Sequence, residues 1–237
     1  MEFTPDLLLH GLVWYVAFVF SLTLHEAAHA WAALKLGDPT ASEGGQVTLN
    51  PVPHIARSPF GTVLVPLLSF GFMGWMMGWA SAPYDPAWAA RHPKRAGWMA
   101  LAGPVSNLFL MLWSGIAIRV GLAAGYFTLP TRDVLSFDRL VVGGDPTADG
   151  VSVLLSILFS LNFLLFLFNL LPLPPLDGSA VIQLVLPKRI SLRYQQLLAE
   201  PMFALLGLIL AWRFFGVLFV PIYGVAVGLL YLGLGVS

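Results

Sequence analysis

Long apolar stretches alternate with short polar ones along most of the chain. The apolar runs cover about 7–34, 60–80, 97–121, 151–171 and 198–236. A helix needs about 20 apolar residues to cross the hydrocarbon of a bilayer, so the earlier runs each have the length of one membrane helix. The last run is long enough for two helices, with a break expected near 213–216. The pattern predicts an all-α polytopic membrane protein with about five to six membrane helices.

The composition indicates that lipid surrounds much of the surface. Of the 237 residues, 58% are hydrophobic and 10% are charged, whereas a soluble domain carries about 25% charged residues. The net charge is zero, so nothing points to nucleic acid as a partner. There is no cysteine, and any metal site must therefore use His, Asp or Glu. The acidic segment 1–6 lacks the basic flank of a signal peptide, so we expect the first run to remain as a membrane helix.

The first apolar run contains two histidines and a glutamate, in the order His25, Glu26, Ala27, Ala28, His29. Residues four apart lie on one face of a helix, so both imidazoles can share one zinc ion. Glu26 lies beside that face and can take a proton from the attacking water. The same pattern arises by chance in helices, where a histidine is usually a satisfied polar residue. Ionisable groups inside an apolar span are costly and usually functional, which favours a metal site in this run.

A catalytic zinc ion needs a third protein ligand and one open position. The candidates are His10, His54, His92 and the carboxylates. Asp177 differs from the other carboxylates because it directly follows an apolar run, within the proline-rich stretch 169–178. Prolines interrupt a helix and allow the backbone and the aspartate to line a cavity inside the protein. The alternative is that Asp177 only caps a short helix at 178–186.

Three motifs resemble those of the site-2 protease family of intramembrane metalloproteases: HEAAH at 25–29, LAGPVSN at 101–107 and NLLPLPPLDG at 169–178. LGDPTA at 36–41 and LNPVPHI at 49–55 are similar to the compact bacterial and archaeal members, and no stretch resembles a PDZ domain. The resemblance extends from about 24 to 186. It implies a single membrane-embedded domain over 1–237, with a core at about 7–186 and C-terminal helices at about 192–236.

The resemblance also implies roles for particular residues. It implies one zinc ion per chain, held by His25, His29 and Asp177, with Glu26 as the general base. Asn169 is implied to have a supporting catalytic role, holding the substrate strand or the oxyanion. Ser179 stands where the family usually has glycine. A small hydroxyl is easily satisfied by the helix backbone, so we expect activity to be retained.

Four further residues are candidates for contact with substrate: Gly45, Asn50, His54 and Asn107. The first two bound a short β-like stretch, which is expected to be re-entrant near the active site and to pair with extended substrate as an added strand. His54 lies in the polar loop that the resemblance folds toward the site; a solvated loop histidine is the alternative. Asn107 follows small helix residues and can hydrogen-bond across the bundle, although simple packing also accounts for this sequence.

The order of the motifs restricts the topology. His25 and His29 lie near the C-terminal end of the first helix, and Asp177 follows the C-terminal end of the 151–171 helix. These helices must therefore run in the same direction, so one run between them does not cross. The run 60–80 is the best candidate because it contains Pro66 and several glycines. The positive-inside rule then places the active-site mouth in the cytoplasm, because one side collects Lys35, Arg57, Arg91, Lys94, Arg95, Lys188, Arg189 and Arg193.

The predicted function is hydrolysis of peptide bonds in or near the transmembrane segments of single-pass or other membrane proteins. We expect the chain to act within the lipid bilayer of a prokaryotic cell membrane. One alternative is a zinc or proton-coupled transporter, because buried His and carboxylate groups also build ion pathways. Another alternative is an inactive substrate-binding scaffold. The glutamate directly after the first histidine favours hydrolysis.

Overall fold

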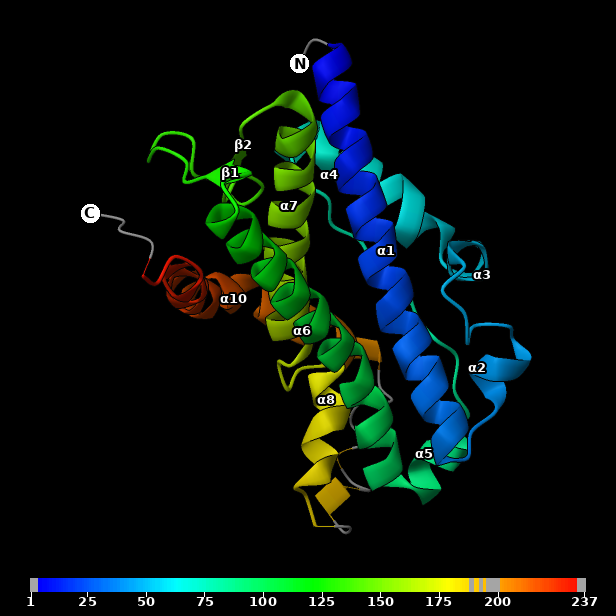
Figure 1. Ribbon diagram of the computed structural model, residues 1–237. Coiled ribbons are helices and arrows are strands. Elements are labelled where there is room, and N and C mark those ends of the chain that lie inside the picture. The colour runs from blue at the N-terminus through cyan, green and yellow to red at the C-terminus, as the bar shows by residue number, and fades with distance from the viewer. Residues whose placement is uncertain (1–3, 188–189, 192–193, 195–200, 234–237) are drawn as a thin grey trace.

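The computed structural model describes residues 4–187, 190–191, 194 and 201–233. Within them four helices are long and apolar enough to cross a membrane, and these are α1 (Pro5–Leu36), α6 (Pro93–Ala123), α7 (Pro146–Asn169) and α10 (Pro201–Leu230) (Figure 1). A fifth candidate is a pair of helices, Pro51–Arg57 and Phe60–Met73, bent by 111°. The helical fold class is confirmed.

The C-terminal run differs from its prediction. α10 continues through 213–216 as one helix, where a break between two helices was expected. Pro221 also lies inside this helix. Apolar residues flank Gly216 and Pro221 on both sides. A membrane helix tolerates glycine and proline when its surroundings satisfy the backbone groups that they leave unpaired. Local helix-weakening residues were therefore insufficient to end the helix.

Local signals define the ends of the helices that hold the bundle. Thr4 caps α1 through a hydrogen bond from the Leu7 amide to its hydroxyl, and Gly37 ends the helix at φ 102°. Asp145 caps α7 by accepting hydrogen bonds from the amides of Thr147 and Ala148. A side-chain acceptor at the N-cap and a left-handed glycine after the last turn satisfy backbone groups that the helix leaves unpaired.

The helices α1, α6 and α7 form the bundle that carries the candidate site (Figure 1). Its apolar core joins Trp14 and Phe18 of α1 to Ile157 and Leu161 of α7. Buried polar side chains also lie between these helices, and they are considered with the site below. α10 packs against α7 through aromatic contacts, including Phe168 with a ring of α10.

The direction of the helices agrees with the topology inferred from the motifs. The Arg95 guanidinium donates a hydrogen bond to the carbonyl of Leu36 at 3.2 Å, so α6 begins where α1 ends. α6 and α7 then run in opposite directions, and α7 lies parallel to α1 (Figure 1). The segment between α1 and α6 therefore leaves and returns at the same end of the bundle, as expected for a run 60–80 that does not cross.

The run 60–80 turns back because its second half leaves the helix. It comprises η1 (Phe60–Leu64) and α4 (Val65–Met73), and Gly74 ends α4 at φ 77°. The chain then returns against η1, where the Trp79 amide donates to the Gly61 carbonyl at 3.1 Å. A Cβ on Gly61 would lie 2.2 Å from the Trp79 carbonyl oxygen, so only glycine permits this approach.

The β-like stretch expected near the site is not a strand in the structure. The one strand pair of the described residues is β1 (Phe127–Thr128) with β2 (Val142–Gly143), antiparallel and within the α6–α7 connection. The stretch 45–50 forms turns and bends instead. Gly45 has φ 71°, and Asn50 caps α3 (Pro51–Arg57) by accepting from the Val52 amide. Local turn and capping interactions therefore determine its conformation.

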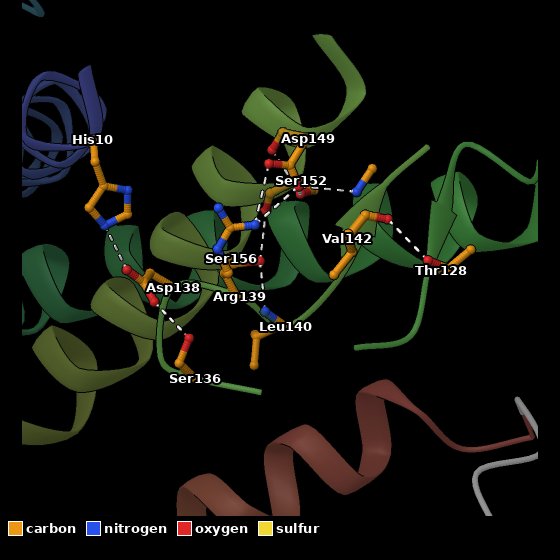
Figure 2. A network of polar contacts seen from close by, with 11 residues as sticks. His10, Thr128, Ser136, Asp138, Arg139, Leu140, Val142, Asp149, Ser152 and Ser156 are labelled. Atoms are coloured by element: carbon orange, nitrogen blue, oxygen red, sulfur yellow. Dashed lines mark hydrogen bonds and ion pairs between the residues drawn. The ribbon is translucent and has the colours of Figure 1, made fainter. Parts of the chain in front are cut away.

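Figure 2 shows the polar network that fastens the α6–α7 connection to the bundle. Asp138 lies 2.8 Å from His10 of α1, and it accepts a hydrogen bond from the Ser136 hydroxyl at 2.8 Å. On the other side, the Leu140 amide donates to Ser156 of α7 at 3.0 Å. These contacts hold the connection across the ends of α1 and α7, at the end of the bundle away from the histidine motif of α1.

We expect the charge on Asp138 to stabilise the protein near neutral pH, and this stabilisation to disappear at acidic pH. Burial disfavours its charge, but hydrogen bonds with His10 and Ser136 outweigh burial and hold its pKa at about 2. The usual pKa is about 3.9, so its contribution is complete above about pH 4 and is lost as the pH falls toward about 2. Asp138→Asn should lower the melting temperature of detergent-solubilised protein near neutral pH, and the difference should shrink across that interval.

The control is Glu43→Gln, which removes an exposed carboxylate from the short helix α2 (Thr40–Glu43). It should change the melting temperature little at any pH in the series. A constant difference between Asp138→Asn and the unmodified protein from about pH 4 to about pH 2 would contradict the role of this carboxylate.

Candidate metal centre

Three side chains with metal-binding atoms converge from distant parts of the chain. His25 and His29 come from α1, and Asp177 directly precedes α8 (Gly178–Val181). The two Nε2 atoms are 2.9 Å apart. Asp177 places Oδ2 3.1 Å from Nε2 of His25 and Oδ1 3.3 Å from Nε2 of His29. The three residues that the motifs predicted as ligands therefore lie together.

The hydrogen bond made by Nδ1 of each histidine shows which ring nitrogen carries the proton and which has a free lone pair. Nδ1 of His29 lies 2.8 Å from the Met99 carbonyl, which only accepts, so this nitrogen donates. Nδ1 of His25 lies 2.5 Å from Oδ1 of Asn107 and donates to it. Each neutral ring then has an unprotonated Nε2 directed toward Asp177. Two ring nitrogens and a carboxylate therefore meet with no proton between them, an arrangement that a cation stabilises.

The geometry fits a zinc ion. Ligand atoms bound tetrahedrally at about 2.0–2.2 Å lie about 3.3 Å from one another. The two Nε2 atoms are 2.9 Å apart, and each lies within this range of one carboxylate oxygen of Asp177, at 3.1 Å from Oδ2 for His25 and at 3.3 Å from Oδ1 for His29. Oδ2 of Asp177 is buried and has no hydrogen-bond partner among the described residues, and a buried polar atom of this kind calls for an ion or water. Two histidines and one aspartate leave a fourth position open, as a catalytic zinc site requires.

Gly103 of α6 keeps space free beside the ligand atoms. A Cβ at this position would lie 2.3 Å from Nε2 of His29 and 2.6 Å from Nε2 of His25. Any side chain would therefore occupy the volume next to both nitrogens. The sequence indicated only that the small residue allows close packing of helices. Its place against two ligand nitrogens is visible only in the assembled bundle.

Asp177 is brought to the histidines by a close turn after α7. A Cβ on Gly178 would lie 2.3 Å from the carbonyl oxygens of Leu170 and Leu171, so glycine is required at this contact. Asp177 occupies the N-cap position of α8, but its side chain makes no capping hydrogen bond. The alternative that it only caps a helix is therefore wrong. The Ser179 hydroxyl donates to the Leu176 carbonyl at 2.7 Å, which satisfies it locally as expected.

The two residues predicted to take part in catalysis have no hydrogen-bond partner for their side chains among the described residues. Glu26 is 4% exposed. Asn169 is the last residue of α7 and is partly buried. Their functional groups therefore make no hydrogen bond that stabilises the described fold. The structure places Glu26 on α1 directly after His25, as the motif requires.

The four predicted substrate contacts lie outside the ligand cluster. His54 is 3% exposed, and its Nε2 lies 3.0 Å from the Thr48 carbonyl. Gly45 and Asn50 form the turn and the cap described above. Asn107 is fully buried and hydrogen-bonds across the bundle to His25 and to Asn162 of α7. This bond across the bundle was one of the two interpretations of Asn107, and it is confirmed.

Two structural residues of the site were missed from the sequence. The Met99 carbonyl, which orients His29, belongs to the backbone and has no residue-type signal. Asn162 was not singled out because one asparagine in an apolar run forms no recognisable motif. Its position inside a membrane helix was the available signal, because polar residues there are usually functional or bonded to another helix.

Comparison with known proteins identifies a family and two relatives. The model of "Peptidase family M50" matches residues 13–209. The Bacillus subtilis (strain 168) protein named "Putative zinc metalloprotease YwhC" is 36% identical over 182 residues, which are 76% of this chain and 72% of that protein.

"Putative zinc metalloprotease Rip2" of Mycolicibacterium smegmatis (strain ATCC 700084 / mc(2)155) is 26% identical over 165 residues, which are 70% of this chain and 54% of that protein. No solved structure matches. The family match includes His25, His29 and Asp177 and covers most of the membrane helices that hold them. The chain belongs to peptidase family M50, the family of the site-2 metalloproteases.

Proposed function

We propose that this chain is a site-2 type intramembrane protease that uses one zinc ion to hydrolyse peptide bonds in or near transmembrane segments of membrane proteins. The observation that carries the proposal is the convergence of His25, His29 and Asp177, with both Nε2 atoms unprotonated. Glu26 follows His25 on the same helix, and its buried carboxylate has no hydrogen-bond partner among the described residues. Membership in a peptidase family and the zinc metalloprotease names of its relatives support the same reaction.

Each residue of the site has a step in this mechanism. His25, His29 and Asp177 would hold the zinc ion, which would supply a Lewis acid for the scissile carbonyl and for the attacking water. Glu26 takes the proton of the attacking water and passes it to the leaving amine. Asn169, at the end of α7, would donate from its amide to the carbonyl oxygen, where a hydrogen-bond donor stabilises developing negative charge. Asn107 and the Met99 carbonyl hold the imidazoles in place through their Nδ1 atoms.

The position of the histidines supports cleavage at membrane depth. α1 has 32 residues and a length of about 48 Å, more than the roughly 30 Å of a bilayer core. His25 lies about 16 Å before the end of this helix, at a rise of about 1.5 Å per residue. A bilayer core centred on α1 would therefore contain His25, near the side where α1 ends and α6 begins. We assign that side to the cytoplasm of a prokaryotic cell, because the basic residues flanking these helix ends follow the positive-inside rule.

Cleavage inside a substrate's apolar segment tests the proposal. The purified protein is placed in liposomes with a single-pass membrane protein, and the new termini are identified by mass spectrometry. We expect cuts within the transmembrane segment near its cytoplasmic end, because the cluster lies inside the layer. A zinc chelator should stop the reaction, and added zinc should restore it.

An unfolded soluble protein serves as the control substrate and should remain uncut at the same concentration. Cuts found only in soluble parts of the membrane substrate would contradict an intramembrane site. Zinc flux into the same liposomes without any cleavage would identify a transporter instead. Binding of the substrate without cleavage, by protein shown to contain zinc, would identify a scaffold.

A further inference from the structure

Asn162 of α7 occupies a place that the catalytic mechanism does not use. It is 0% exposed, and its side chain hydrogen-bonds to Ser21 of α1 and to Asn107 of α6. Its Nδ2 donates to the Leu158 carbonyl at 2.8 Å and to the Ser21 hydroxyl at 2.9 Å. Its Oδ1 accepts from Nδ2 of Asn107 at 2.8 Å, and Asn107 in turn contacts Nδ1 of His25. A buried row of polar groups therefore leads from α7 to a metal ligand.

The surroundings of Asn162 permit only one orientation of its amide. The carbonyl of Leu158 accepts hydrogen bonds and never donates them. Ser21 uses its single hydroxyl proton on the Ala17 carbonyl, at 2.7 Å, so it too offers only a lone pair. Both neighbours consequently require the nitrogen of the amide, and the Oδ1 atom must face the other way.

This orientation is passed on to the metal ligand. The Oδ1 atom of Asn162 can be satisfied only by a donor, so Asn107 must present its nitrogen to it. Asn107 then presents Oδ1 to His25, whose Nδ1 must carry the ring proton. The proton is therefore excluded from Nε2, the atom that faces Asp177. The acceptors Ser21 on α1 and Leu158 on α7 thus determine the tautomer of His25, through the side-chain amides of Asn162 and Asn107.

We propose that Asn162 is a positioning residue that keeps Nε2 of His25 unprotonated for the metal by fixing the orientation of Asn107. This inference rests on the proposed zinc site. Without Asn162 the Asn107 amide is free to turn over and offer its nitrogen to His25. That orientation favours the ring proton on Nε2, which blocks metal binding. Partners that orient a ligating histidine typically contribute a factor of about 10–100 in metal affinity.

The test is the zinc dissociation constant of purified, detergent-solubilised protein, measured by competition with a chelator of known affinity. We expect Asn162→Leu, which removes both the donors and the acceptor, to weaken zinc binding by about 10–100-fold. Asn162→Ala is measured beside it, in case the larger apolar side chain prevents folding. Retention of the full zinc affinity by either folded variant would overturn the proposal.

Asn162→Asp separates positioning from packing. A protonated carboxyl group has nearly the shape of the amide, donates from one oxygen to Leu158 or Ser21, and accepts from Asn107 with the other. We therefore expect this variant to keep a zinc affinity within a few-fold of the unmodified protein, even if it is less stable. A loss as large as that of Asn162→Leu would contradict the proposal, because the retained acceptor would then have no effect.

Ser160→Ala is the matched control for burial. Ser160 lies on the same helix, is equally buried and bonds to the Tyr223 hydroxyl of α10 at 2.6 Å, away from His25. This variant should lower the melting temperature without changing the zinc dissociation constant. Equal weakening by Ser160→Ala and Asn162→Leu would show a general effect of packing and refute the specific role. Failure of the unmodified protein to bind zinc would instead refute the proposed function.

Discussion

Gly103→Ala is expected to give a folded protein that binds no zinc and cleaves no substrate. The added Cβ would lie 2.3 and 2.6 Å from the Nε2 atoms of His29 and His25. Zinc must approach those atoms to about 2.0–2.1 Å, so a methyl group in this volume excludes the ion or pushes the rings apart. Alanine is also a better helix former than glycine by about 1 kcal/mol, so the helix itself is not weakened.

Metal analysis of the purified variant measures this result, together with its melting temperature in the presence of a chelator. Gly115→Ala is the control, because it makes the same change in α6 where the Cβ would lie 3.2 Å from the ring of Phe159. It should retain zinc and activity. Stoichiometric zinc in Gly103→Ala would mean that α6 does not border the ion, and would contradict a zinc position between the two Nε2 atoms and Asp177.

Glu26→Gln is expected to retain zinc and lose cleavage. Glutamine has nearly the shape of glutamate but does not accept the proton of the attacking water. Loss of a general base lowers a rate by about 10²–10⁴-fold. The three metal-binding side chains are unchanged, so the zinc content should stay at one ion per chain. Metal analysis and the liposome cleavage assay on the same preparation test both parts.

Glu43→Gln provides the control, because it removes an exposed carboxylate on α2 and should leave both zinc and cleavage unchanged. Cleavage at the normal rate by Glu26→Gln would show that another group accepts the proton. Loss of zinc from the same variant would mean that Glu26 contributes to the metal site itself. Either result would require a different assignment for this residue.

The membrane class and the candidate ligand residues were predicted from the sequence. The apolar runs have the length of membrane helices, and the four-residue spacing of His25 and His29 places both on one helix face. The place of Asp177 after an apolar run and among prolines made it a candidate, and the resemblance to the site-2 proteases implied its role as a ligand. Local patterns were misleading where tertiary contacts or neighbouring turns decide: α10 continues through 213–216, and 45–50 forms turns instead of a strand.

The sequence by itself determined which side chains can bind a metal, because helical periodicity and the cost of charge in lipid are local properties. Only the tertiary structure decided which hydrogen bonds orient the two histidine rings toward a metal ion. The partner of His25 lies 82 residues away on α6, and that of His29 is a backbone carbonyl 70 residues away. Asn162 joins the network from α7, 55 residues beyond Asn107. Hydrogen bonds and close approach depend on distances between helices, which packing of the whole bundle sets.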